Sequence, residues 1–224
     1  MPGFSSREPR AGRAPSRHSG VRLLEADEAA QLVETLALAF RDNPLNRAAI
    51  RGQATRRLRS NRYGMRATLA ATQGRSTILV PGRSHANLAG PALGGLIALA
   101  PGGWPLPPPP LLAQFELWLG QGIGTLRRWG HVYEQLAELH PLGPHWYLQL
   151  LGVDSGVRRA GIGSSLLRAW LEVVDADGVP AYLETDRQEN IAFYGQHGFE
   201  VVGTHAILKT PIWRMRRPGS TPPT

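Results

Sequence analysis

The spacing of hydrophobic residues along the chain predicts a mixture of helices and strands. Apolar residues three and four positions apart indicate amphipathic helices, and short apolar runs bounded by turn residues indicate strands. In the first two thirds of the chain the pattern predicts helices over 27–40, 45–71 and 111–140, with a break near Gly120, Gly122 and Gly124 as the alternative for the last of them. It predicts strands over 21–24, 76–80 and 92–99, of which the last two should form a hairpin. Asp27 is the expected N-cap of the first helix.

The last third of the chain has a sharper pattern. Trp146–Val153 is a strongly apolar run, long enough to be a central strand. A polar loop leads from this run into a helix that Gly178 should end. The remaining elements are expected to be a strand over 181–184, a helix over 189–197 and strands over 199–202 and 211–215. Strands that alternate with helices in this way indicate one α/β (α+β) domain.

Composition limits the kind of protein. The chain has 224 residues, is 42% hydrophobic and contains no cysteine, which excludes disulfides, thiolate catalysis and cysteine-ligated metals. No apolar run could cross a membrane and no secretory segment is evident, so we expect a cytoplasmic protein without a membrane partner. Residues 1–20 and 218–224 have compositions typical of disordered ends, and the domain should span 21–217.

The formal charge of +8 raises the question of a nucleic-acid partner. Part of this charge lies in the N-terminal tail, at Arg7, Arg10, Arg13 and Arg17. A second cluster, from Arg47 to Arg66, contains no acidic residue, but apolar residues recur within it at helical spacing. We interpret this cluster as the solvated face of an amphipathic helix, with binding of an anion or a nucleic acid as the alternative.

The loop after the apolar strand is the strongest candidate for binding chemistry. A strand that leads through glycines into a helix directs unpaired N–H groups and the positive end of the helix dipole at one point, which suits a phosphate. Gly161 and Gly163 allow close approach of a ligand, and Arg158 or Arg159 adds positive charge. A dinucleotide fold would want a glycine where Leu166 stands, and no nucleotide P-loop sequence occurs. A pyrophosphate ligand is therefore expected, with a loop that binds nothing as the alternative.

Two motifs in register resemble the GNAT superfamily of N-acetyltransferases. The first is Arg-x-x-Gly-x-Gly at 158–163, and the second is Asn-Ile-Ala-Phe-Tyr at 190–194 followed by Gly-Phe at 198–199. The resemblance extends to the puromycin N-acetyltransferase branch through residues 21–23, 35–40, 179–185 and 213–215. It implies a GNAT fold, in which helices flank a mixed, mostly antiparallel central sheet, and it implies acetyl-CoA as the cosubstrate.

The resemblance also implies where acetyl-CoA binds. In this family the sheet splays beside the strand before the loop, and the pantetheine arm pairs with the strand backbone, here at Leu151, Gly152 and Val153. The pyrophosphate would bind at Arg158, Arg159, Ala160, Gly161, Ile162, Gly163 and Ser164. This loop departs from the usual Q-G-K/R-G-x-G because Arg159 replaces a glycine and Ala160 replaces a basic residue, which would weaken CoA affinity or re-aim a guanidinium. Asn190 would orient the cofactor or cap the next helix, and capping is the preferred interpretation.

Acetyl transfer to an amine needs a base, donors for the developing oxyanion and an acid for the departing thiolate. Tyr194, which the resemblance places beside the thioester sulfur, is the expected acid, with a packed core tyrosine as the alternative. Glu184 ends an apolar strand and is the expected base, directly or through water; the alternative is an ordinary strand-end carboxylate. His131, His140 and His145 lack the spacing of metal ligands, so we expect no metal.

The expected function is an acetyl-CoA-dependent N-acetyltransferase that acts on a primary amine. The branch resemblance favours a small-molecule acceptor, antibiotic-like or nucleoside-like, bound by the divergent segment 47–144. A protein N-terminus or lysine is the alternative acceptor, and a non-catalytic module that binds CoA or nucleic acid is the alternative from another class. Nucleic acid is not the expected partner, and a homodimer is left open. The tryptophans are expected in the core rather than in an acceptor pocket: Trp104, Trp118, Trp129 and Trp146.

Overall fold

The computed structural model describes residues 20–82, 90–157 and 159–219. Its strands are β1 (Val21–Leu23), β2 (Ser76–Pro81), β3 (Gly94–Leu99), β4 (Trp146–Val153), β5 (Ala181–Thr185), β6 (Glu200–Ile207) and β7 (Thr210–Arg217). Its helices are α1 (Ala29–Ala39), α2 (Pro44–Ala49), α3 (Ala54–Thr72), α4 (Gly90–Leu93), α5 (Leu111–Gln121), α6 (Ile123–Leu139), α7 (Ile162–Asp177) and α8 (Glu189–Gly195), with 3₁₀ turns η1 (Ala26–Glu28) and η2 (Ser155–Val157). The ends predicted to be disordered, 1–20 and 218–224, lie largely outside the described residues.

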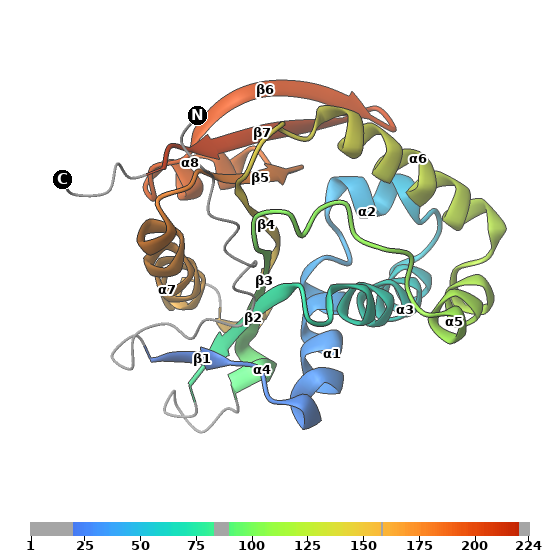
Figure 1. Cartoon of the computed structure of the whole chain (residues 1–224). Coiled ribbons are helices and arrows are strands. Elements are labelled where there is room, and N and C mark those ends of the chain that lie inside the picture. The colour runs from blue at the N-terminus through green and yellow to red at the C-terminus, as the bar shows by residue number, and fades with distance from the viewer. Residues whose placement is uncertain (1–19, 83–89, 158, 220–224) are drawn as a thin grey trace.

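The centre of the molecule is a seven-stranded sheet in the order β1-β2-β3-β4-β5-β7-β6. Neighbouring strands are antiparallel except β4 and β5, which run parallel. Figure 1 shows α7 on one side of this sheet and α1, α3 and α5 on the other. The predicted α/β domain with a mixed, mostly antiparallel sheet is confirmed.

Each face of the sheet is buried by its own helices. The apolar stripe of α7, which includes Leu166 and Trp170, packs on one face and is fully buried. Leu32 and Leu36 of α1 are fully buried against the other face together with Met65 of α3. Full burial of each such side chain stabilises the fold by roughly 1.5–3 kcal/mol, so β4 is held firmly between the two layers. No helix among the described residues is both long and apolar enough to span a membrane.

The start of the chain differs from the prediction at two helix boundaries. The expected helix over 45–71 is two helices, α2 and α3, because Gly52 between them has a φ of +114°. Asp27 is not an N-cap: it lies inside η1, where Glu25 and Glu28 form a capping box, and Glu28 is the N-cap of α1. Glutamate in a capping box gives a weaker sequence signal than a Ser, Thr, Asp or Asn cap, which explains the error.

The basic cluster lies on α2, on α3 and between them, and its charge is partly neutralised by acidic residues of neighbouring segments. Arg57 of α3 pairs with Asp42 at 2.5 Å and donates to the backbone oxygen of Arg41 at 3.2 Å. Arg62 pairs with Glu34 of α1 at 2.7 Å. The predicted amphipathic pattern is confirmed by burial on the opposite face of α3, and these two arginines help to hold α3 against the segment that contains α1.

Candidate functional site

The strands β4 and β5 are paired only at their beginnings. Their pairing runs from Trp146 to Leu148 of β4, whereas β3 stays paired with β4 as far as Val153. The register of β3 against β4 shifts at Gln149, so that β4 carries a bulge that re-aims the rest of the strand. Beyond Leu148, no described strand pairs with the β5-facing edge of β4. The backbone groups of that edge can therefore pair with an extended ligand.

The glycine loop and the start of α7 follow directly from this part of β4. Gly161 is the N-cap of α7 with a φ of +79°, and no side chain caps the helix. The N–H groups of the first turn, at 162–164, lie at the positive end of the helix dipole without an intrahelical acceptor. A Cβ atom at Gly163 would meet its nearest neighbours at an ordinary contact distance of 3.6 Å. The uncapped start of a 16-residue helix is suited to a phosphate.

The two loop positions that depart from the family pattern differ in backbone conformation. Arg159 is exposed and has a φ of +67°, in the left-handed region that glycine adopts freely. This conformation costs an arginine about 1 kcal/mol relative to glycine. Arg159 also adds a guanidinium at the loop surface. Ala160 is exposed and its N–H donates to the Val157 oxygen at 3.4 Å. Arg158 lies outside the described residues.

A cavity of about 990 Å³ adjoins the gap between β4 and β5. Its lining includes β4 from Tyr147 to Val153, the end of β5, α8, and residues of α1, α3 and α6. The prediction that the tryptophans belong to the core is correct only for the fully buried Trp146. Trp104 and Trp129 line the cavity, and Trp118 is 53% exposed on α5.

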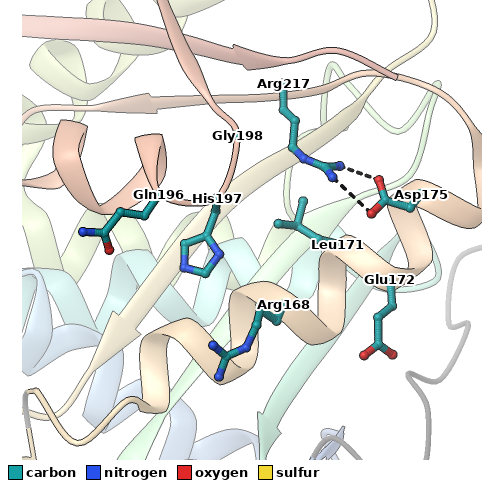
Figure 2. Close-up of a pocket in the computed structure, with 8 residues that line it drawn as sticks. All are labelled: Arg168, Leu171, Glu172, Asp175, Gln196, His197, Gly198 and Arg217. Atoms are coloured by element: carbon teal, nitrogen blue, oxygen red, sulfur yellow. Dashed lines mark hydrogen bonds and ion pairs between the residues drawn. The ribbon is translucent and has the colours of Figure 1, made fainter. Parts of the chain in front are cut away.

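A second hollow lies between α7 and the turn that follows α8, next to the end of β7 (Figure 2). Arg217 binds Asp175 there through two hydrogen bonds of 2.5 and 3.1 Å. Burial and the charges of Arg168 and Arg217 lower the pKa of His197. None of the predicted site residues that the structure describes lines this hollow, so it is not a candidate for the predicted chemistry.

Tyr194 lines the main cavity from α8 and is 7% exposed. Its ring packs edge-on against Phe193 and Phe199, with centroid distances of 5.1 and 5.9 Å. Burial raises the pKa of the Tyr194 phenol, and the charge of Asp186 raises it further. The hydroxyl therefore stays protonated at neutral pH and can donate to a group bound in the cavity.

Asp186 is a cavity residue that the sequence analysis missed. Its Oδ2 accepts a hydrogen bond from the N–H of Leu45 at 2.8 Å, in the first turn of α2, and its Oδ1 accepts one from Asn43 at 3.4 Å. Burial raises the pKa of Asp186, and the Leu45 N–H opposes this shift. Strand alternation places Asp186 on the same side as Glu184, two positions earlier, and that signal could have identified it.

Glu184 also lines the cavity, and its side chain is 8% exposed. Its Oε1 lies 3.9 Å from Nδ1 of His140, and neither atom has a hydrogen-bond partner among the described residues. Tyr147 and Tyr182 flank the carboxylate, and the pKa of each phenol is raised by burial and then by the charge of Glu184. Glu184 is therefore placed to accept a proton from a group in the cavity.

Asn190 does not cap α8. It is the second residue of that helix, whose N-cap is Gln188, so the preferred capping interpretation is wrong. Its Nδ2 donates to the Oγ1 of Thr185 at 3.0 Å, which joins the start of α8 to the end of β5. Asn190 lines the cavity.

The structure brings part of the predicted site together in one cavity. Leu151, Gly152 and Val153 line the cavity, as do the two predicted catalytic residues, Glu184 and Tyr194. Gly152 packs tightly against α1, since a Cβ atom there would lie 2.7 Å from a methyl carbon of Leu36. The described loop residues, 159–164, do not line the cavity but continue from β4 at its edge.

The chain is similar to known acetyltransferases in sequence and in fold. A family model described as an acetyltransferase (GNAT) domain matches residues 113–201. A solved structure described as histone acetyltransferase HPA2 and related acetyltransferase, from Corynebacterium glutamicum ATCC 13032, is 20% identical and has a TM-score of 0.69, covering 95% of this chain and all of that one. The ribosomal-protein-S18-alanine N-acetyltransferase of Escherichia coli is 14% identical with a TM-score of 0.53, covering 91% of this chain and 95% of that one.

A further similar structure is the PaiA N-acetyltransferase of Thermoplasma acidophilum, which was solved in complex with coenzyme A. It is 14% identical, has a TM-score of 0.52, and covers 88% of this chain and 97% of that one. The chain thus has the fold of these acetyltransferases, and its segment 113–201, which carries β4, the glycine loop and Tyr194, matches the family model of an acetyltransferase (GNAT) domain.

Proposed function

We propose that the protein transfers the acetyl group of acetyl-CoA to the primary amine of a small, cationic molecule with an apolar body. The observation that carries the proposal is the cavity beside the β4–β5 gap, which Glu184 and Tyr194 both line. A base and an acid therefore face one space that adjoins a strand edge and an uncapped helix start. That combination suits acyl transfer better than binding alone.

Acetyl-CoA supplies the activated acyl group, and the chain offers it two kinds of contact. The free edge of β4 at Leu151–Val153 can pair with the amides of the pantetheine arm. The first turn of α7 can accept the pyrophosphate, and the exposed guanidinium of Arg159 adds positive charge. We include Arg158, Ala160 and Asn190 in this binding set.

The two catalytic roles follow from protonation. Glu184 accepts the proton that the acceptor ammonium must lose before its nitrogen can attack. Tyr194 holds a proton at neutral pH because its pKa is raised, and this proton is available to the departing thiolate. An N–H group on the free edge of β4 can donate to the oxyanion that develops on the acyl carbonyl.

The cavity itself supports a small cationic acceptor. Its volume of about 990 Å³ is at the upper end of the range of small-molecule pockets. The charged residues that line it are mainly acidic although the whole chain carries +8: Glu134, Glu184, Asp186, Glu189 and Arg187. Trp104, Trp129 and Tyr147 provide aromatic surface. Carboxylates together with aromatic rings suit an ammonium group on a flat or apolar body, which agrees with the antibiotic-like or nucleoside-like acceptor suggested by the puromycin N-acetyltransferase resemblance.

A calorimetric titration with acetyl-CoA, followed by a thiol-release assay, tests the proposal. The acceptor panel contains puromycin, tyramine, an aminoglycoside and a peptide with a free N-terminus. We expect saturable acetyl-CoA binding and turnover with the aromatic amines. Gly161→Val should abolish binding because valine does not tolerate a φ of +79°, whereas Gly163→Ala should retain it because its Cβ meets only ordinary contacts.

Two other results would redirect the assignment. Turnover with the peptide alone would replace the small-molecule acceptor by a protein N-terminus. Absence of acetyl-CoA binding, together with salt-sensitive binding of a DNA duplex, would refute the transferase proposal and favour a nucleic-acid-binding module.

A further inference from the structure

Two histidines that do not line the cavity lead from Glu184 toward the protein surface. His140 follows the last turn of α6, its side chain is 6% exposed, and its Nδ1 is the atom 3.9 Å from Glu184 Oε1. Its other ring nitrogen, Nε2, lies 2.9 Å from Nε2 of His145. The Nδ1 of His145 in turn lies 2.8 Å from the backbone oxygen of the exposed Gly143. The two rings thus connect a buried carboxylate with the protein surface.

Hydrogen-bonding rules fix the protons in this chain of contacts. A carbonyl oxygen only accepts, so the contact to Gly143 requires a proton on Nδ1 of His145. The Nε2 of a neutral His145 is then an acceptor, and His140 must donate to it from its own Nε2. The Nδ1 of a neutral His140 is therefore unprotonated. It is a buried, unpartnered base that faces Glu184.

Neighbouring groups hold the two rings in this arrangement. The indole of Trp104 stacks on His140 at 4.8 Å, and the ring of Tyr147 packs edge-on against it at 4.8 Å. Tyr182 contacts both imidazoles edge-on, at 5.2 and 5.8 Å. Burial, the neighbouring His140 and the charge of Arg216 lower the pKa of His145, while the hydrogen bond to Gly143 and the charge of Glu184 raise it. The net effect is a lowered pKa, which favours the neutral ring. Neither histidine lines the cavity, so neither is placed to touch the acceptor.

We infer that His140 and His145 form a relay that returns the proton collected by Glu184 to solvent, so that the base is free for the next turnover. This inference rests on the proposed function. Closing the 3.9 Å gap to hydrogen-bonding distance needs a side-chain shift of only about 1 Å. The proton moves from the Glu184 carboxyl to Nδ1 of His140, and the proton on Nε2 of His140 moves to Nε2 of His145. The proton on Nδ1 of His145 then leaves to water, so one proton enters the pair and one leaves. Proton exchange with water returns both rings to their starting tautomers before the next transfer.

The relay makes a kinetic prediction that a structural role does not. In His145→Ala and His145→Gln, Glu184 can still accept one proton, so the first turnover should keep its rate. Later turnovers should slow by at least about tenfold, less than the 10²–10⁴ expected on loss of a direct acid or base. Rapid mixing with acetyl-CoA and tyramine should therefore show a burst of about one product per site. Added imidazole should restore the slow phase in proportion to its concentration, because it replaces the missing proton carrier.

The matched control is His205→Ala on the exposed face of β6, which should show no burst and no response to imidazole. Equal slowing of the first and later turnovers in the His145 variants, or no slowing at all, would overturn the relay. Failure of the wild-type protein to acetylate tyramine would count against the proposed function instead.

A second measurement is independent of turnover. Nitrogen-proton NMR correlation of the histidine rings reports which nitrogen of each neutral imidazole carries the proton. We expect the proton on Nε2 in His140 and on Nδ1 in His145, in the full chain without ligands. A proton on Nδ1 of neutral His140 would contradict the relay, because that ring could not then accept a proton from Glu184.

Discussion

Replacement of Tyr194 by phenylalanine is the most direct test of the acid. The change removes only a hydroxyl, and the ring contacts with Phe193 and Phe199 at 5.1 and 5.9 Å remain. The free energy of unfolding should therefore change by less than about 1 kcal/mol. If the hydroxyl protonates the departing thiolate, kcat should fall by roughly 10²–10⁴, which corresponds to a barrier about 2.7–5.4 kcal/mol higher. Affinity for acetyl-CoA should be unchanged, because the proposed binding mode places its main contacts on β4 and α7.

The assay compares kcat, the calorimetric Kd for acetyl-CoA and the midpoint of denaturant unfolding for the wild type and the variant. Because burial and Asp186 raise the pKa of Tyr194, the wild type should show no loss of kcat through this group below about pH 10. Tyr63→Phe on α3, outside the cavity, is the control and should leave all three quantities unchanged. An unchanged kcat in Tyr194→Phe would remove this residue from the mechanism, and a weaker Kd would show that the loss is structural.

Four further predictions concern stability. Gly120→Ala should destabilise the protein by about 1–2 kcal/mol in denaturant unfolding, because its Cβ would overlap the ring of Tyr63 and overpacking outweighs the helix-propensity gain. Gly130→Ala, in α6 with open space around it, should stabilise it by about 0.5–1 kcal/mol. Arg159→Gly should relieve left-handed strain and change the unfolding free energy by less than about 1 kcal/mol, while a lower affinity for acetyl-CoA would reveal the contribution of its guanidinium. The pKa of Tyr182 is raised in the folded protein, so above about pH 10 the unfolded state loses this proton before the folded state does. The free energy of unfolding should therefore fall as the pH rises above about 10, and it should fall less steeply in Tyr182→Phe.

The elements of the proposed acetyl-CoA site, β4, the glycine loop and α7, were predictable because each has a local sequence pattern. Trp146–Val153 is covered on both faces and therefore reads as a continuous apolar run, which matches β4 residue for residue. The apolar stripe of α7 has helical spacing, and Gly178, with a φ of +69°, ends the helix as expected. The prediction that β4, a glycine loop and a helix follow one another depended only on neighbours in sequence.

The hairpin of β6 and β7 shows where local signals fail. The predicted strand ended at residue 202, but β6 runs to Ile207 before it turns into β7. The turn residues Leu208 and Lys209 have φ values of +48° and +62°, conformations that Asn or Gly usually signal. Most of β6 is exposed at the sheet edge, so no alternation of buried and exposed residues marked its length.

The acceptor side depends on contacts that no local pattern records. His140 at the end of α6 meets Glu184 on β5, and Trp104 from the proline-rich connector stacks on the same ring. Each of these residues alone resembles an ordinary core or surface residue, and only the fold brings them together. The acetyl-CoA site was therefore easier to predict from the sequence than the acceptor site. In the proposed function, acetyl-CoA binds a backbone edge and a helix start, which belong to a fold that is retained at 20% identity, whereas the acceptor binds side chains, which differ among proteins of one fold. The acceptor must therefore be identified by experiment, and the charges and rings of the cavity determine which amines to test first.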